Sequence, residues 1–118
     1  MDKEIGAKMK PGDKWVDLSD RDRKRVGYND DSFLDKWKRL PKNKPSHTIV
    51  AHLQKDGYMF IHPTQDRTIS VREAARLQSF PDHFVFCGGR GSQFRQVGNA
   101  VPPLLARAVG KTVLNIIS

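Results

Sequence analysis

The feature that most constrains this chain is its last segment, an apolar stretch that begins in the residues QVGNAVPP (96–103). The Gly-Asn pair predicts a turn, because both residues tolerate a positive φ. The two prolines suit the first turn of a helix, where amide hydrogens lack an intrahelical partner. Apolar residues then recur at the spacing of an amphipathic helix: Leu104, Leu105, Ala108, Val109, Thr112, Val113, Ile116 and Ile117. A stripe this wide needs a large apolar surface to cover it.

Length and composition indicate that the rest of the chain offers little such surface. The chain has 118 residues, 37% of them apolar, and we expect one soluble domain, or part of a larger one, with a modest core. No apolar run approaches the roughly 18 residues that a membrane span needs, and no apolar block at the N-terminus marks a secretory signal. A single cysteine, Cys87, cannot form an internal disulfide, so we expect a cytoplasmic protein. The four histidines lack metal-ligand spacing, and we expect no metal site.

The charge of the chain favours a polyanionic partner such as nucleic acid. Its 21 basic and 13 acidic residues give a net charge of +8. A solvated basic surface without a partner is the alternative. Residues 1–65 interleave 14 basic with 10 acidic residues, whereas residues 66–118 hold 7 basic and 3 acidic ones. Six of those seven are arginines, which suit bidentate contacts with phosphate and base edges: Arg67, Arg72, Arg76, Arg90, Arg95 and Arg107.

The middle of the chain predicts a β-hairpin. The segments TIVAHL (48–53) and YMFI (58–61) are rich in β-branched and aromatic residues. They flank QKDG, whose Asp56-Gly57 pair is a strong hairpin signal. Residues 1–45 are polar and irregular, with at most a short helix around residues 31–40, and we expect them to fold by packing on something else.

The clearest local pattern lies in RTISVREAARLQSFPD (67–82), which predicts a short helix. Ser70 and Glu73 have the spacing of a capping box, and Pro81 ends the helix. One face of that helix carries Val71, Ala74, Ala75 and Gln78. Residues 83–95 are rich in glycine and predict a loop that leads to the C-terminal segment.

Two of these stretches, RTISVREAARLQSFPD and RQVGNAVPPLLA, closely resemble the ninth and tenth motifs of the cytosine-C5 DNA methyltransferases. KPSHTIVAHLQKDGYMFIHP is similar to the end of the target-recognition region that precedes them in that family. The resemblance covers residues 38–118 strongly, and residues 5–37 more loosely as an earlier part of the same region. Two long motifs in the right order and spacing are specific.

The resemblance implies an α+β fold in three parts. Residues 1–66 would form a partial, DNA-reading target-recognition region with a β-hairpin. Residues 67–82 would form the short ninth-motif helix. Residues 83–118 would comprise a loop, the tenth-motif cofactor loop and an amphipathic helix that normally packs on a Rossmann-like methyltransferase domain.

The resemblance also implies contacts with a cofactor and with DNA. Asn99, Ala100 and Val101 match the loop that lines the S-adenosylmethionine pocket, which this chain would share with the catalytic domain. Thr48 and His52 match positions that approach double-stranded DNA, by phosphate contact and by reading near the target base. At the start of the ninth-motif helix, amide hydrogens and guanidinium groups could meet phosphate, which makes Arg67, Thr68 and Arg72 candidates. Structural packing is the competing role for this motif.

The catalytic parts of such an enzyme are missing from the sequence. The family's Gly-rich cofactor loop, its Pro-Cys nucleophile and its Glu-Asn-Val motif do not occur. Attack on C6 of a flipped cytosine needs an activated thiolate and a proton donor in one desolvated pocket. Cys87 follows a phenylalanine and precedes two glycines, with no base beside it, so we expect an ordinary loop thiol and no catalytic residue in this chain.

Three hypotheses follow. The chain is the C-terminal portion or small subunit of a DNA (cytosine-5-)-methyltransferase, inactive alone and completed by a catalytic domain or subunit that carries the Pro-Cys and Glu-Asn-Val motifs. It is a non-enzymatic DNA-binding module. Or it is an inactive remnant of a methyltransferase gene. For the first, we expect a prokaryotic cytoplasmic protein associated with the nucleoid.

Overall fold

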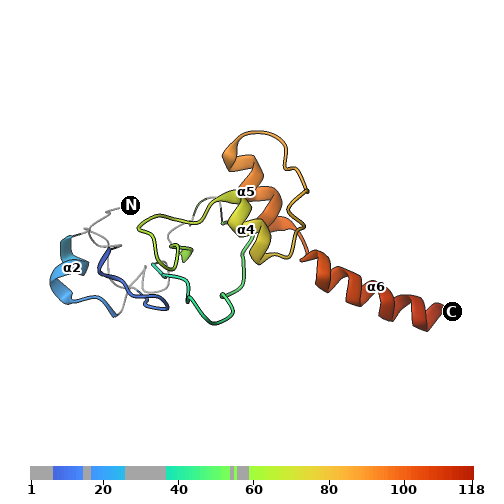
Figure 1. Ribbon diagram of the computed structural model, residues 1–118, viewed down its shortest axis with the longest axis horizontal. Coiled ribbons are helices and arrows are strands. Elements are labelled where there is room, and N and C mark those ends of the chain that lie inside the picture. Colours follow the sequence, from blue (N-terminus) through green and yellow to red (C-terminus); the bar gives the residue numbers. More distant parts are fainter. Residues whose placement is uncertain (1–6, 15–16, 26–36, 54, 56–58) are drawn as a thin grey trace. The chain divides into compact units, whose positions relative to one another are not determined.

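The computed structural model describes residues 7–14, 17–25, 37–53, 55 and 59–118 of the chain. Within these residues the helices are α2 (Asp20–Arg25), α4 (Val71–Leu77), α5 (Arg90–Asn99) and α6 (Pro103–Ile117), as Figure 1 shows. The chain divides into two units. The first consists of residues 1–48 and 55–69, and the second of residues 49–54 and 70–118.

Isolated backbone bridges, not strands, hold the described part of the first unit together. Ile61 pairs with Arg39 in parallel and with Thr68 antiparallel. The amide of Leu40 donates to the carbonyl of Ile61 at 2.9 Å, and the amide of Ile69 donates to the carbonyl of Phe60 at 2.9 Å. The buried apolar residues of this unit are Met9, Leu18, Trp37, Leu40, Phe60, Ile61 and Ile69.

The predicted hairpin of residues 48–53 and 58–61 is not found among the described residues, and its Asp56-Gly57 turn lies outside them. Residues 48–50 make no bridge, and residues 51–53 form a turn. The backbone of Val50 and Ala51 packs instead against α5, where a Cβ on Gly98 would lie 2.7 Å from the carbonyl oxygen of Val50. Tertiary packing has overridden the β propensity of this segment. Most of the helix considered at residues 31–40 also lies outside the described residues.

Helix α4 confirms the prediction from its capping box. The Ser70 side chain accepts a hydrogen bond from the amide of Glu73 at 3.2 Å, and the Glu73 carboxylate accepts one from the amide of Ser70 at 2.7 Å. The capping box therefore satisfies two backbone donors at the helix start that have no intrahelical partner. The predicted inner face is buried at Ala74, Ala75 and Gln78, and partly buried at Val71.

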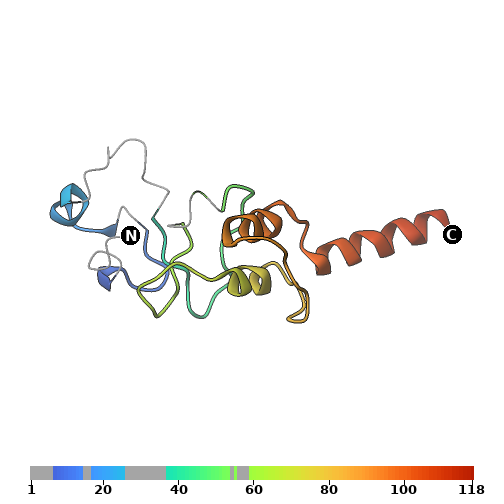
Figure 2. The ribbon, with the colours of Figure 1, turned by 90° about the horizontal axis from the view of Figure 1, so that it is seen from above.

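Helix α5 was not predicted, and the expected loop over residues 83–95 is wrong from Arg90 onward. The N-cap residue of α5 is Gly89, which has no side chain to accept a hydrogen bond from the first amides of the helix. The sequence therefore carries no side-chain capping signal at this point. Side chains of the helix bond back to the loop that precedes it: the Gln93 Nε2 donates to the carbonyl of Gly88 at 2.8 Å, and the Gln96 Nε2 donates to that of Cys87 at 2.7 Å. Helices α4 and α5 lie side by side in Figures 1 and 2. Tertiary contacts thus make a helix from a glycine-rich sequence.

The Gly98-Asn99 pair is not a turn, because both residues belong to the last turn of α5. The second unit buries Ile49, Leu53, Ala74, Ala75, Phe86 and Val97.

Helix α6 confirms the prediction for the C-terminal segment. It begins at Pro103 after the cap residue Pro102, and it contains no buried residue. Its exposed large apolar side chains are Leu104, Leu105, Val109, Val113, Leu114, Ile116 and Ile117.

Among the described residues, the helical stretch Arg90–Ile117 is long and apolar enough to cross a membrane by length and composition alone, which differs from our expectation. The stretch comprises α5 and α6 with a break at residues 100–102. At about 1.5 Å per residue, α6 is roughly 22 Å long, shorter than the roughly 30 Å hydrocarbon core of a bilayer. It also carries Arg107 and Lys111.

Candidate functional site

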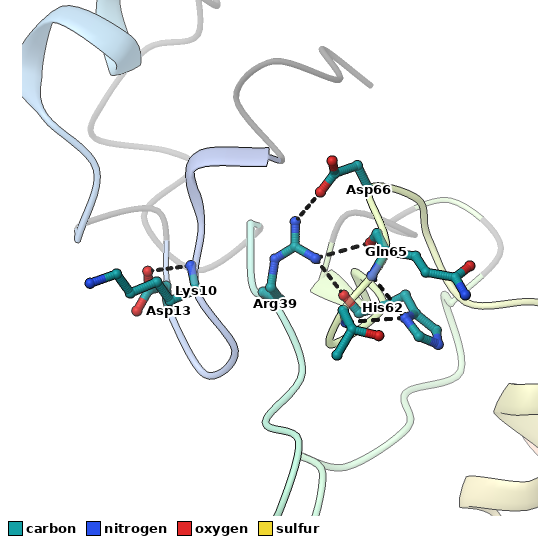
Figure 3. A network of polar contacts seen from close by, with 7 residues as sticks. Lys10, Asp13, Arg39, His62, Gln65 and Asp66 are labelled. Carbon is teal, nitrogen blue, oxygen red and sulfur yellow. Dashed lines mark hydrogen bonds and ion pairs between the residues drawn. The ribbon is translucent and has the colours of Figure 1, made fainter.

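The loop that precedes α4 is built around a buried arginine that sequence reasoning missed. The side chain of Arg39 donates to the carbonyls of His62 at 2.7 Å and Gln65 at 2.9 Å, and it forms an ion pair with Asp66 at 2.8 Å (Figure 3). Arg39 is only 4% exposed, so these contacts compensate its desolvation. A buried arginine so far along the sequence from its acceptors leaves no local signal.

A histidine closes the same loop from within. The Nδ1 of His62 accepts hydrogen bonds from the amides of Thr64 at 3.2 Å and Gln65 at 3.1 Å. The carbonyl of Arg67 accepts a 2.7 Å hydrogen bond from the amide of His62, which brings the two ends of the loop together. The segment from His62 to Arg67 therefore has a defined conformation.

Arg67 and Thr68, two of the predicted DNA contacts, lie at the end of this loop and are half-buried. The Nε of Arg67 donates to the side-chain oxygen of Gln65 at 2.6 Å, and one of its terminal nitrogens donates to the carbonyl of Thr68 at 3.2 Å. Thr68 pairs with Ile61 through its backbone. The arginine is thus oriented by its own loop.

Arg72, the third predicted contact in this motif, has a structural role. Its Nη2 donates to the carbonyl of Phe84 at 2.8 Å, and its guanidinium lies 5.8 Å from the centre of the Phe86 ring. The rings of Phe80, Phe84 and Phe86 form a cluster with centroids 5.0–5.1 Å apart. The Nη1 of Arg72 is buried and has no hydrogen-bond partner within the described part of the chain. Arg72 holds the aromatic loop that follows α4.

The other two predicted DNA contacts have accessible side chains. Thr48 is exposed, and His52 is exposed in the turn of residues 51–53. The residue before Thr48 was not predicted as functional: His47 stacks on Phe60 with ring centroids 4.6 Å apart. Burial, aided by the positive charge of Lys38, lowers the pKa of His47 below its ordinary value of 6.5. His47 is therefore a neutral packing residue at neutral pH.

The predicted cofactor residues lie together in the connection from α5 to α6. Asn99 is exposed at the end of α5, and Val101 is 61% exposed. Ala100 is half-buried, and its carbonyl accepts a 3.3 Å hydrogen bond from Gln78. An amide side chain able to donate and accept, beside an apolar side chain, offers what one wall of a nucleoside-binding pocket needs. These residues fit the predicted cofactor contact.

The remaining groups of chemical interest are Cys87 and the side chains that could bind a metal ion. Cys87 is a free, exposed thiol whose carbonyl accepts the hydrogen bond from Gln96. A group of His, Cys, Asp and Glu side chains suited to a metal ion is not found in this part of the chain.

Comparison with known proteins shows the family of the chain. Residues 3–115 match the protein-family model described as C-5 cytosine-specific DNA methylase. The chain belongs to this family. The match covers both units, and it agrees with the resemblance of residues 67–82 and 95–106 to the ninth and tenth motifs of the cytosine-C5 methyltransferases.

Several relatives from the methyltransferase family are much longer than this chain. The type II methyltransferase M.AgeI of Thalassovita gelatinovora is 56% identical over 86 residues, which cover 73% of this chain and 20% of that protein. The type II methyltransferase M.Sau96I of Staphylococcus aureus is 34% identical over 120 residues, which cover 98% of this chain and 28% of that protein. The chain spans about a fifth of the length of the first relatives that it matches.

One methyltransferase relative is short. The type II methyltransferase M.AquIB of Picosynechococcus sp. is 45% identical over 93 residues, which cover 70% of this chain and 65% of that protein. The aligned part makes up about two thirds of each protein, so the two chains are similar in length. A chain comparable in length to this one thus also bears the type II methyltransferase name.

Proposed function

We propose that this chain is the C-terminal portion or small subunit of a DNA (cytosine-5-)-methyltransferase. It contributes DNA target recognition through residues 1–66 and the ninth-motif helix at residues 67–82. Residues 83–118 supply part of the S-adenosylmethionine pocket and the helix that joins the catalytic domain. The short relative M.AquIB supports a small subunit as one form of this arrangement.

The observation that carries the proposal is the exposed apolar stripe of α6. The helix buries none of its residues, although Leu105 and Val109 would each contribute roughly 1.5–3 kcal/mol if fully removed from water. Amphipathic helices of this kind gain most of their stability from packing. The stripe starts within a few residues of Asn99 and Val101, so a catalytic domain that covers α6 would also reach the cofactor loop.

The cofactor would be held in part by the connection between α5 and α6. Asn99 would offer its side-chain amide, Ala100 its backbone and Val101 its apolar side chain. When bound, S-adenosylmethionine supplies an activated methyl group for C5 of cytosine. The role of this chain would be to bind and orient that molecule and to exclude water from one side of the pocket.

The proposed DNA contacts are side chains that are either exposed or oriented by hydrogen bonds within their own loop. Thr48 and His52 are accessible to a duplex. Arg67 and Thr68 would present a guanidinium and a hydroxyl to phosphate from a loop that the Arg39 network orders. The contacts of Arg72 with Phe84 and Phe86 favour a role in holding the protein surface, with phosphate contact secondary.

The chain alone should not transfer methyl groups. Its only cysteine is an exposed loop thiol, and neither a Pro-Cys nor a Glu-Asn-Val motif occurs in the sequence. A partner domain in the same cytoplasmic compartment would supply the nucleophile, the proton donor and the rest of the pocket.

Reconstitution tests this proposal. The purified chain, incubated with labelled S-adenosylmethionine and DNA of mixed sequence, should transfer no methyl groups. Addition of the polypeptide that carries the Pro-Cys and Glu-Asn-Val motifs should give transfer to cytosine C5. The proposal would be wrong if the chain alone transferred methyl groups and Cys87→Ser abolished that transfer.

The two other hypotheses predict different results. A non-enzymatic DNA-binding module would be a stable monomer that binds DNA without stimulating any partner. A gene remnant would lack a neighbouring reading frame with the two catalytic motifs. Inspection of the adjacent genes separates the remnant from the small subunit before any protein is made.

A further inference from the structure

A buried glutamine at the end of α4 fixes the segment that carries the proposed cofactor residues. Gln78 is 7% exposed, and its Nε2 donates to two backbone carbonyls, those of Val97 at 3.1 Å and Ala100 at 3.3 Å. These carbonyls lie on either side of Gly98 and Asn99. One amide group thus ties the last turn of α5 to the first residue beyond it.

The two acceptors are positions where helix geometry leaves a carbonyl available. The last carbonyls of a helix have no intrahelical donor, and the chain turns away at Ala100. The amide of Ala100 donates to the carbonyl of Val97 at 3.4 Å, a long contact that by itself holds the exit weakly. Gln78 supplies the donors that define this exit.

The residue after Gln78 holds the other end of the same segment. Ser79 has a φ of 65°. The amide of Ser79 donates to the carbonyl of Arg76, and the amide of Phe80 donates to the carbonyl of Ala75, which is the pattern of a Schellman motif. The Ser79 Oγ accepts a 3.1 Å hydrogen bond from the amide of Leu104 in the first turn of α6. Because Pro102 and Pro103 carry no amide hydrogen, Leu104 is the first donor of α6 that needs a partner.

We infer that Gln78 is a positioning residue for the cofactor loop. The inference rests on the proposed function, in which Asn99 to Val101 contact S-adenosylmethionine. Gln78 does not touch the cofactor; it sets the path of the backbone between Val97 and Ala100, while Ser79 holds that path at Leu104. The C-terminal end of α4 thereby fixes the cofactor loop.

Two substitutions of Gln78 disrupt its pair of hydrogen bonds in different ways. Gln78→Met keeps the length and fills the buried site with apolar atoms, so the fold should tolerate it. Gln78→Asn keeps the amide but is one methylene shorter, so it cannot reach both carbonyls. Gln93→Met is the matched control, because Gln93 also donates to a backbone carbonyl, that of Gly88, but at the N-terminal end of α5 and not at its exit.

The first measurement is amide hydrogen exchange on the purified chain, which does not depend on the proposed function. Gln78→Met should raise exchange in residues 98–106 and leave the protected amides of α4 unchanged, whereas Gln93→Met should leave residues 98–106 unchanged. Exchange in residues 98–106 that stays at the wild-type rate in both Gln78 variants would overturn the inference. So would a uniform rise across α4 and α5, which indicates a general loss of packing.

The second measurement is S-adenosylmethionine binding by the enzyme reconstituted with its catalytic partner. Gln78→Met should raise the Kd and KM for S-adenosylmethionine about tenfold, which corresponds to roughly 1.4 kcal/mol, with kcat and DNA binding near wild type. A wild-type complex that does not bind the cofactor would refute the proposed function itself, and with it this role of Gln78. A wild-type complex that binds, with variants that bind equally well, would refute the role of Gln78 alone.

Discussion

Gly98 lies so close to the backbone of Val50 that a Cβ at this position would be 2.7 Å from the Val50 carbonyl oxygen. Gly98 also lies within α5, where alanine would ordinarily be favoured over glycine. The steric clash outweighs the higher helix propensity of alanine, because a backbone carbonyl cannot move aside as a flexible side chain can. Gly98 is required for close approach of two segments and not for a turn.

We predict that Gly98→Ala destabilises the chain by about 1–3 kcal/mol, the usual cost of overpacking. Denaturant unfolding of the purified chain measures this change. Gly110→Ala is the matched control, because a Cβ at Gly110 in α6 would meet nothing within 4 Å. That variant should increase helix content, by up to about 1 kcal/mol of helix propensity, as seen by circular dichroism. A Gly98→Ala variant as stable as wild type would contradict the close packing.

Local signals explain which helices could be predicted. The Ser70 and Glu73 capping box lies within one helical turn, and the structure forms both of its hydrogen bonds. The periodicity of α6 and its two prolines likewise depend only on neighbouring residues. Such signals act before any tertiary contact is made, so the sequence alone reveals them.

Contacts between distant residues explain what the sequence could not reveal. Arg39 finds its partners 23 to 27 residues further along the chain, and no pattern around it announces them. Helix α5 contains Gly91 and Gly98, which disfavour a helix, and it packs on α4, an element that ends at Leu77. In the site, the exposed loop at Asn99 and Val101 agrees with the predicted cofactor contact, which stays a prediction. The contacts of Arg72 with Phe84 and Phe86 could not be predicted from its place in the ninth motif.

The pH dependence of stability should report on His47. Burial and Lys38 lower its pKa in the folded chain below 6.5, so the unfolded chain binds the proton more tightly. Stability should therefore fall as the pH drops below about 6.5 and level off below the folded pKa. Chemical unfolding between neutral and mildly acidic pH measures this. His47→Gln should flatten the dependence, and His83→Gln, at an exposed position, controls for the loss of one imidazole. An unchanged profile in His47→Gln would assign the effect to other groups.

The role of Arg67 in DNA binding should appear in the salt dependence. We expect the purified chain to bind duplex DNA weakly, with an affinity that falls steeply as salt rises, because counterions are released. Arg67→Ala should lower the affinity for all sequences and reduce the salt slope by about 1, the value for one lost phosphate contact. Arg76→Ala is a suitable control, because Arg76 is engaged with Asp82 through two hydrogen bonds. An Arg67→Ala variant with the wild-type slope would show that Arg67 only closes its own loop.

The last prediction concerns α6 and the catalytic partner. Leu105 is 55% exposed in the apolar stripe, so Leu105→Asp should change the thermal stability of the isolated chain little. We expect the exposed stripe to make the isolated chain self-associate, and the charge at position 105 should reduce that association. In the reconstituted enzyme the same substitution should abolish the rescue of methyl transfer, because it places a charge in the interface that we propose for α6. Lys111→Ala, on the polar side of the helix, should leave the rescue intact. A sharp fall in the melting temperature of the isolated chain with Leu105→Asp would instead make α6 an internal core helix. The free-standing DNA-binding module would then be the better account of this chain.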